Sequence, residues 1–315
     1  MAHVLPDRWI WDSWYVWEED ACHLFYLCAS RGLSNPEERH RAAAIGHAVS
    51  TDLVNWEVLP DALAPSQREK FDSWTTWTGS VVRADDGEWR MFYTGTSRED
   101  GGLIQRIGVA ASSDLMVWEK RDSPIIEADP QWYEVLNDRH WPDQAWRDPW
   151  VFRQPGRADW SMLITARHNH GDPAKRGALG LARSDDLENW NVLAPLSEPG
   201  HGFGQMEVFQ YAEVDGVPLL LFSCGWRELS PERVKNIGKV DTTYSLVTSS
   251  LEGDLDFRKA SPFPGDPLYA GRLVQKPNGE WNLLGFLGYE KGKFVGEIPD
   301  PIRVSASVSH GLVVL

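Results

Sequence analysis

Five short apolar segments recur along the chain, each bounded by small, acidic or other polar residues. They lie at residues 24–27, 91–93, 162–164, 219–222 and 283–286. Each is too short for a core helix and rich in residues that favour strands, so each is predicted to be a buried β-strand. Long helical periodicity is nearly absent, and only residues 35–44 and 231–238 are expected to be helical. The pattern is typical of an all-β protein.

An eleven-residue string with constant spacing shows that the chain is built from repeats. The string G-x-A-x-S-x-D-L-x-x-W occupies residues 46–56, 108–118 and 180–190, and a degraded fourth copy runs from Tyr244 to Phe257. The Asp of each copy is suited to hydrogen-bond the backbone of a tight turn. A period of roughly 60–70 residues fits a propeller blade better than a solenoid unit.

Each repeat unit supports about four strands. The first precedes the apolar segment, which is the second. The G-x-A-x-S string is the third, and the segment after D-L-x-x-W is the fourth. Five such units in 315 residues predict five radial sheets, which make a five-bladed β-propeller. Because the repeat runs from end to end, residues 1–315 are expected to form one domain.

Composition restricts the class of partner. The net charge of −15 disfavours nucleic acid or an anionic membrane as a partner. No signal peptide and no span of about 20 apolar residues is visible. The three cysteines, Cys22, Cys28 and Cys224, are expected to be free buried thiols. Together these features favour a cytoplasmic protein, and the sequence leaves the oligomeric state open.

Three carboxylates fall in the first predicted strand of their units. Asp12 lies in unit one, Asp148 in unit three and Glu207 in unit four. The first strand of each blade lines the central channel of a propeller, so the three side chains are predicted to meet at one funnel. A buried carboxylate without a partner is costly, which indicates a functional site. The structural alternative is that they bind a cation or pair with Arg147.

Two carboxylates that meet in one funnel are the pair of catalytic groups that a retaining glycosidase requires. Such enzymes set the two groups about 5–5.5 Å apart, one as nucleophile and one as acid/base. The acid needs a raised pKa, and Glu207, between Met206 and Val208, fits that requirement. Asp12 beside Ser13 is expected to stay ionised. Asp148 directly follows Arg147 and is expected to stay ionised and to bind substrate hydroxyls.

Four motifs in order resemble clan J glycoside hydrolases. The segment W-D-S-W at residues 11–14 resembles the nucleophile motif of family 68, the levansucrase type. W-T-G-S at residues 77–80 resembles a segment shared with family 32, the invertases and fructanases. Arg147-Asp148-Pro149 matches the R-D-P motif of both, and Met206-Glu207-Val208 resembles the E-C segment of family 32. The family 32 N-D-P-N-G motif is absent, and the C-terminal β-sandwich of that family is not expected within residues 1–315.

The resemblance implies a β-fructofuranosidase that acts with retention on sucrose or short fructo-oligosaccharides. Asp12 would be the nucleophile, Glu207 the acid/base and Asp148 the stabiliser of the transition state. Four further residues would shape the sugar pocket: Trp11, Trp77, Thr78 and Arg147. No cofactor or metal is implied. The open alternatives are fructosyl transfer to a sugar, a related arabinofuranosidase or xylosidase, and a non-catalytic sugar-binding propeller.

Several other residues have more than one interpretation. His168 and His170 lie at metal-ligand spacing, but without an evident third ligand they indicate a solvated or substrate-side loop. His47 replaces an apolar residue of the repeat and is interpreted as a hydrogen-bonded core histidine, with a role near the site as the alternative. Arg272 lies in the first predicted strand of unit five, and the sequence leaves open whether it reaches the funnel. Residues 37–41 are predicted to form a solvated helical face.

Overall fold

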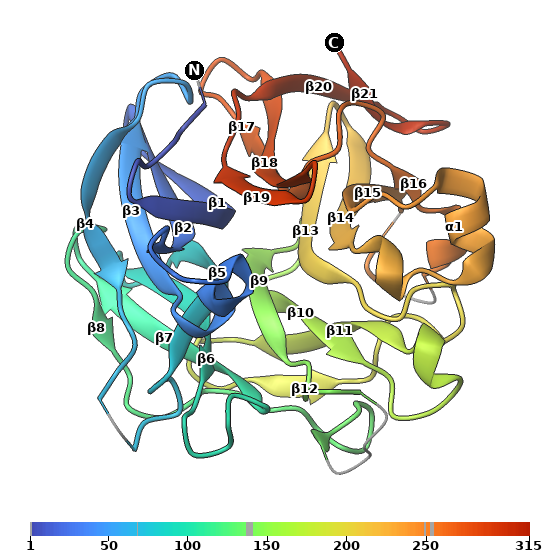
Figure 1. Ribbon diagram of the computed structural model, residues 1–315, viewed down its shortest axis with the longest axis horizontal. Coiled ribbons are helices and arrows are strands. Elements are labelled where there is room, and N and C mark those ends of the chain that lie inside the picture. The colour runs from blue at the N-terminus through green and yellow to red at the C-terminus, as the bar shows by residue number, and fades with distance from the viewer. Residues whose placement is uncertain (1, 68, 137–140, 249, 253–254) are drawn as a thin grey trace.

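The computed structural model describes residues 2–67, 69–136, 141–248, 250–252 and 255–315. Five antiparallel sheets are arranged radially around a central channel (Figure 1). The prediction of an all-β five-bladed propeller is therefore confirmed.

The blades follow one another in chain order. Blade one contains β1 (Arg8–Glu18), β2 (Ala21–Ser30), β3 (Ala44–Ser50) and β4 (Glu57–Leu63). Blade two contains β5 (Thr75–Arg83), β6 (Trp89–Thr96), β7 (Gln105–Ser112) and β8 (Glu119–Lys120). Blade three contains β9 (Arg147–Arg153), β10 (Trp160–Arg167), β11 (Gly177–Ser184) and β12 (Asn191–Leu193).

Blade four keeps this four-stranded plan, and blade five adds a strand to it. Blade four contains β13 (Glu207–Val214), β14 (Val217–Cys224), β15 (Thr242–Val247) and β16 (Ser261–Pro262). Blade five contains β17 (Tyr269–Gln275), β18 (Trp281–Glu290), β19 (Lys293–Glu297), β20 (Ile302–Ser307) and β21 (Gly311–Val314). Here β19 pairs with the end of β18 and adds an extra hairpin to the sheet.

The repeated D-L-x-x-W string forms the turn between the third and fourth strands of a blade, as predicted. In blade one, Asp52 Oδ1 accepts hydrogen bonds from the N–H groups of Val54 and Asn55, both at 2.8 Å. The following Leu53 has a φ of 67°, a left-handed conformation that these hydrogen bonds support. The turn fixes the register of the two strands it joins.

The Trp of the repeat packs between blades. The Trp118 ring meets Phe25 of the preceding blade edge-on at 5.8 Å, and Trp190 meets Phe92 in the same way at 5.7 Å. Each aromatic edge-to-face pair adds about 0.5–1.5 kcal/mol beyond burial. The repeat therefore specifies the contacts between blades as well as the blades themselves.

The ring closes where the first residues meet blade five. His3 and Ile298 exchange two backbone hydrogen bonds, at 2.7 and 3.2 Å. This bridge and the contacts between β1 and β17 join the first blade to the last.

His47 is fully buried, and its Nε2 lies 2.9 Å from Nδ1 of His23, which confirms a hydrogen-bonded core histidine. Cys22, Cys28 and Cys224 are free and buried, as predicted.

Helical structure is confined to short connections. The 3₁₀ segments are η1 (Pro36–Arg41), η3 (Pro173–Lys175), η4 (Trp226–Glu228) and η5 (Phe257–Lys259), and the α-helix is α1 (Pro231–Ile237). At 7 residues, α1 is the longest helix in the described part of the chain, far below the roughly 20 residues a bilayer crossing needs.

Candidate active site

Each of the five innermost strands has an irregularity at the same level. The shift in register falls between Trp11 and Ser13 in β1, and between Trp77 and Gly79 in β5. The other three strands shift directly after the paired residues Arg147, Glu207 and Tyr269. The last paired residues before the shift are thus Trp11, Trp77, Arg147, Glu207 and Tyr269, one from each blade. The bulges collect these side chains, with the shifted Asp12, Thr78 and Asp148, at one end of the channel.

The bulges of three strands are held open by hydroxyl groups from neighbouring blades. Asp148, Val208 and Ala270 have φ values of 58°, 57° and 51°. Their N–H groups donate to Thr94 Oγ1 (2.9 Å), Thr165 Oγ1 (3.1 Å) and Ser223 Oγ (2.9 Å), respectively. Each hydroxyl lies on the second strand of the preceding blade. These bonds satisfy buried backbone donors and support a left-handed conformation that is costly for residues other than Gly.

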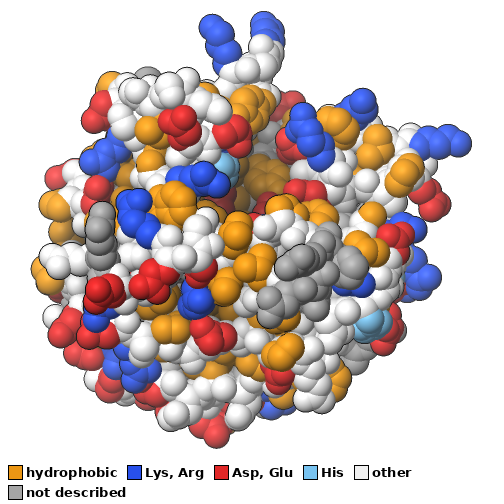
Figure 2. Space-filling model, turned by 60° about the horizontal axis from the view of Figure 1, so that its bottom comes forward, with side chains coloured by type: hydrophobic (Ala, Val, Ile, Leu, Met, Phe, Trp, Pro, Cys, Tyr) orange, Lys and Arg blue, Asp and Glu red, His pale blue; other side chains and the backbone are white. Residues whose placement is uncertain are grey.

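A cavity of about 350 Å³ lies at this end of the channel, and all seven predicted site residues line it. They are Trp11, Asp12, Trp77, Thr78, Arg147, Asp148 and Glu207. The three predicted carboxylates are therefore brought together from β1, β9 and β13. Figure 2 shows a hollow on one face of the molecule with acidic, basic and hydrophobic side chains around its rim.

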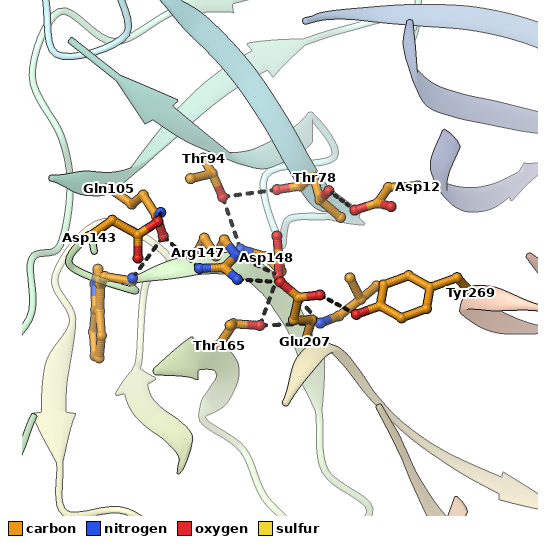
Figure 3. A network of polar contacts seen from close by, with 12 residues as sticks. Asp12, Thr78, Thr94, Gln105, Asp143, Arg147, Asp148, Thr165, Glu207 and Tyr269 are labelled. Atoms are coloured by element: carbon orange, nitrogen blue, oxygen red, sulfur yellow. Dashed lines mark hydrogen bonds and ion pairs between the residues drawn. The ribbon is translucent and has the colours of Figure 1, made fainter. Parts of the chain in front are cut away.

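Asp12 is held by Thr78 of the neighbouring blade. Thr78 Oγ1 donates to Asp12 Oδ2 at 2.5 Å (Figure 3). Burial raises the pKa of Asp12 to about 6, and the Thr78 hydrogen bond opposes that rise. The expected support from Ser13 is wrong, because the Ser13 hydroxyl pairs with Tyr15 at 2.9 Å instead. Asp12 is ionised above about pH 6.

Glu207 lies between a cation and a phenol. Arg147 Nη2 donates to Glu207 Oε1, and the Tyr269 hydroxyl donates to Glu207 Oε2 (Figure 3). Burial favours the neutral acid, but the Arg147 charge and these hydrogen bonds outweigh it and leave the pKa of Glu207 below its usual value. The predicted raised pKa of Glu207 is wrong, because Arg147 reaches across from the preceding blade.

Asp148 is the most buried of the three carboxylates, with 3% of its surface exposed. Thr165 Oγ1 donates to its Oδ2 at 2.8 Å, and Arg147 Nε lies 3.5 Å from the same oxygen. Burial raises the pKa of Asp148 to about 7, against the opposing charge of Arg147. The expectation that Arg147 keeps Asp148 fully ionised is therefore wrong, because burial outweighs the effect of the Arg147 charge.

Sequence reasoning missed Tyr269 and misjudged the segment 37–41. Glu37 and Glu38 are exposed as predicted, but Arg39 is 6% exposed, with its guanidinium 3.8 Å from the centre of the Phe294 ring. The carbonyl of His40 accepts the Trp77 Nε1–H at 2.8 Å. The prediction of a wholly solvated face is wrong, since η1 forms one wall of the cavity. For Tyr269, the available signal was its place at the start of the first strand of unit five.

Arg272 stays in the interior. It is 1% exposed, its guanidinium lies 4.6 Å from the centre of the Trp150 ring, and its Nη1 donates to backbone carbonyls of β13. Around His168 and His170, and elsewhere in the described ranges, no cluster of three or more His, Cys, Asp or Glu side chains has the arrangement of a metal site. His168 is buried, whereas His170 is exposed.

Residues 9–293 match the family described as "Glycosyl hydrolases family 32 N-terminal domain". The chain belongs to this family. This family 32 domain is 33% identical over 275 residues to an insoluble β-fructofuranosidase isoenzyme of Arabidopsis thaliana, covering 82% of this chain and 46% of that protein. It is 32% identical over 173 residues to sucrose-6-phosphate hydrolase of Bacillus subtilis (strain 168), covering 55% of this chain and 32% of that protein. The chain thus spans less than half the length of these curated relatives.

Solved structures show the same fold. The family 32 domain superimposes on the inulosucrase of Halalkalicoccus jeotgali bound to kestose with a TM-score of 0.80 at 23% identity, covering 98% of this chain and 87% of that one. It superimposes on the GH32 β-fructofuranosidase BmSUC1 of Bombyx mori with a TM-score of 0.75 at 21% identity, covering 100% of this chain and 64% of that one. The resemblance to clan J enzymes found in the sequence is confirmed.

Proposed function

We propose that this family 32 domain is a retaining glycoside hydrolase that removes terminal β-fructofuranosyl residues from sucrose or short fructo-oligosaccharides. The observation that carries the proposal is that Asp12 and Glu207, from different blades, line one small cavity together with Asp148. Family membership supports the same reading. A non-catalytic sugar-binding propeller would not require this set of carboxylates, since the set has the composition of a retaining site.

In this mechanism, Asp12 attacks the anomeric carbon of the fructosyl residue while the glycosidic bond breaks. Glu207 protonates the departing oxygen, and then, as a carboxylate, activates the water that hydrolyses the fructosyl–Asp12 ester. Thr78 holds the attacking carboxylate by its hydrogen bond to Oδ2. Asp148, held by Thr165, binds ring hydroxyls of the substrate.

The shape of the site supports exo-action. The cavity that holds the three carboxylates is about 350 Å³ and is walled by Trp11, Trp77 and η1. A second, larger cavity of about 960 Å³ begins at Glu207 and Tyr269. The terminal fructosyl ring fits the small cavity, where aromatic and charged groups surround it. The leaving group extends into the larger one, on the side of the proposed acid/base.

The test is a product time course on sucrose, on short inulin-type and levan-type oligosaccharides, and on aryl arabinofuranosides. We expect free fructose as the first product from the fructosides, and no fructose from the Asp12→Ala variant of the same chain. Fragments of intermediate length that appear before fructose would refute exo-action. Kestose as the main product from sucrose would assign fructosyl transfer instead. Activity on arabinofuranosides alone would overturn the proposal.

A further inference from the structure

A fourth carboxyl group shares the leaving-group side of the site with Glu207. Glu228, in η4, lines the 960 Å³ cavity whose wall includes Glu207 and Tyr269. None of the steps proposed above uses Glu228. The backbone and the side chain of Glu228 both contact residues close to this cavity, and charged groups of the cavity surround its carboxyl.

The backbone ties Glu228 to the segment that leads into β13. The Gly204 N–H donates to the Glu228 carbonyl at 2.6 Å, and the Ser230 N–H donates to the Gly202 carbonyl at 2.9 Å. Between these bonds, Phe203 and Leu229 form an antiparallel bridge. Glu207 begins β13 three residues after Gly204. The two glutamates are therefore carried by paired segments and keep a fixed relation.

The side chain of Glu228 is packed beside Gly225. A methyl group on Gly225 would lie 3.4 Å from Glu228 Oε2 and 3.4 Å from Asp241 Oδ1. Asp241 Oδ1 already accepts the Trp226 N–H at 2.7 Å. Asp241 is thus held by the backbone of η4, and the Glu228 carboxyl, which accepts a hydrogen bond from the Gly225 backbone, belongs to a residue that lines the cavity.

The charged and titratable groups around Glu228 come from several elements. They are Glu207 on β13, Arg147 on β9, Cys224 on β14, Tyr269 on β17, Asp241 and Lys239 after α1, Arg227 on η4, and Glu37 and Arg39 on η1. Burial holds the pKa values of Cys224 and Tyr269 well above their usual values, so both stay neutral. Burial and the Glu207 charge raise the pKa of Glu228 to about 7, whereas Glu207 titrates below its usual range.

We propose that Glu228 is a positioning residue for the acid/base step: Glu207 and Glu228 share one proton and keep it available to the leaving group. The inference rests on the proposed function. Two interacting carboxyl groups titrate as a pair, and the second loses its proton only at higher pH. As the glycosidic C–O bond breaks and the Asp12 ester forms, the proton of the pair passes through Glu207 to the departing oxygen. The water that later hydrolyses the ester returns a proton to the pair.

The experiment compares the pH dependence of kcat/KM for the wild type and Glu228→Gln, on sucrose and on a fructoside with an activated leaving group. We expect the alkaline limb on sucrose to fall near pH 7 in the wild type. In Glu228→Gln it should move at least one pH unit lower, with about 10-fold or more loss of rate at pH 7 and less than about 3-fold loss at pH 4.5. The activated substrate, which needs little protonation, should lose far less.

Two further variants make the result decisive. Glu232→Gln removes the same charge from an exposed residue of α1 and should keep the wild-type limb. Glu228→Asp keeps a carboxyl group and should keep the limb within about half a unit. An unmoved limb in a folded Glu228→Gln variant, even with a raised KM, overturns the inference and leaves the proposed function standing. A wild type without activity on any β-fructofuranoside refutes the proposed function instead.

Discussion

Arg147 donates hydrogen bonds to Glu207, sixty residues away, and to Gln105, rather than to Asp148, its neighbour in the sequence. The nearest Asp148 oxygen lies 3.5 Å from Arg147 Nε. The Arg147–Glu207 ion pair favours the charged form of Glu207, whereas burial favours the neutral forms of Asp12 and Asp148. Glu207 therefore has the lowest pKa of the three carboxyl groups. In the free enzyme the proposed acid is thus the most acidic of the three, and substrate binding must favour its protonated form.

Removing the Tyr269 hydroxyl should shift the pH profile. Tyr269→Phe takes a hydrogen bond from the Glu207 carboxylate, so the pKa of Glu207 rises and the protonated acid persists to higher pH. We expect the alkaline limb of kcat/KM on sucrose to move up by about one unit. Tyr15→Phe is the control, since the Tyr15 hydroxyl meets Ser13 and not Glu207. A limb that moves down in Tyr269→Phe would contradict the assignment of Glu207 as acid.

Asp12→Asn should abolish turnover and yet stabilise the fold at alkaline pH. The folded-state pKa of Asp12 is about 6, above its unfolded value, so the folded protein binds more protons between about pH 4 and 6. Stability from this group is therefore present below pH 4 and lost as pH rises through 6. Urea unfolding at pH 8 should show Asp12→Asn more stable by on the order of 1–3 kcal/mol. At pH 4 the difference should vanish, and equal stability at both pH values would refute the raised pKa.

Glu207→Ala should separate the acid from the nucleophile. A general acid contributes about 10²–10⁴-fold, so the loss on sucrose should fall in that range. A fructoside with an activated leaving group needs little protonation, and its first step should be nearly unchanged. Added azide should then restore turnover by replacing the activated water. An equal loss on both substrates, measured as kcat/KM, would show that Glu207 is not the acid.

The hydroxyl bonds between blades should contribute to both stability and activity. Thr165 is fully buried, accepts the Val208 N–H and donates to Asp148. Thr165→Val leaves that N–H with only its longer contact to Asp148 Oδ2 at 3.4 Å, and the loss of the shorter hydrogen bond costs about 1–3 kcal/mol. The variant should also lower kcat, because Asp148 loses its support. Thr165→Ser keeps the hydroxyl and should lie close to the wild type in denaturant midpoint and rate, and equal effects of Val and Ser would show that the hydroxyl is unimportant.

The candidate site could be predicted from the sequence because the repeat shows which positions are equivalent in successive blades. Once residues 46–56, 108–118 and 180–190 are recognised as equivalent, Asp12, Asp148 and Glu207 fall in the first strands of their blades. First strands of a propeller meet at the channel whatever their side chains are. The fold, and the blade on which each carboxylate lies, can therefore be predicted from the periodicity and spacing of the sequence.

The partners of those carboxylates were decided only by the tertiary structure. Thr78, rather than Ser13, supports Asp12, and Arg147 and Tyr269 together hold Glu207. Each of these contacts crosses from one blade to another. Their geometry depends on the bulge in each first strand and on how closely neighbouring blades pack. Burial, which raises the pKa values of Asp12 and Asp148, also comes from all five blades at once, so no segment of the sequence encodes it.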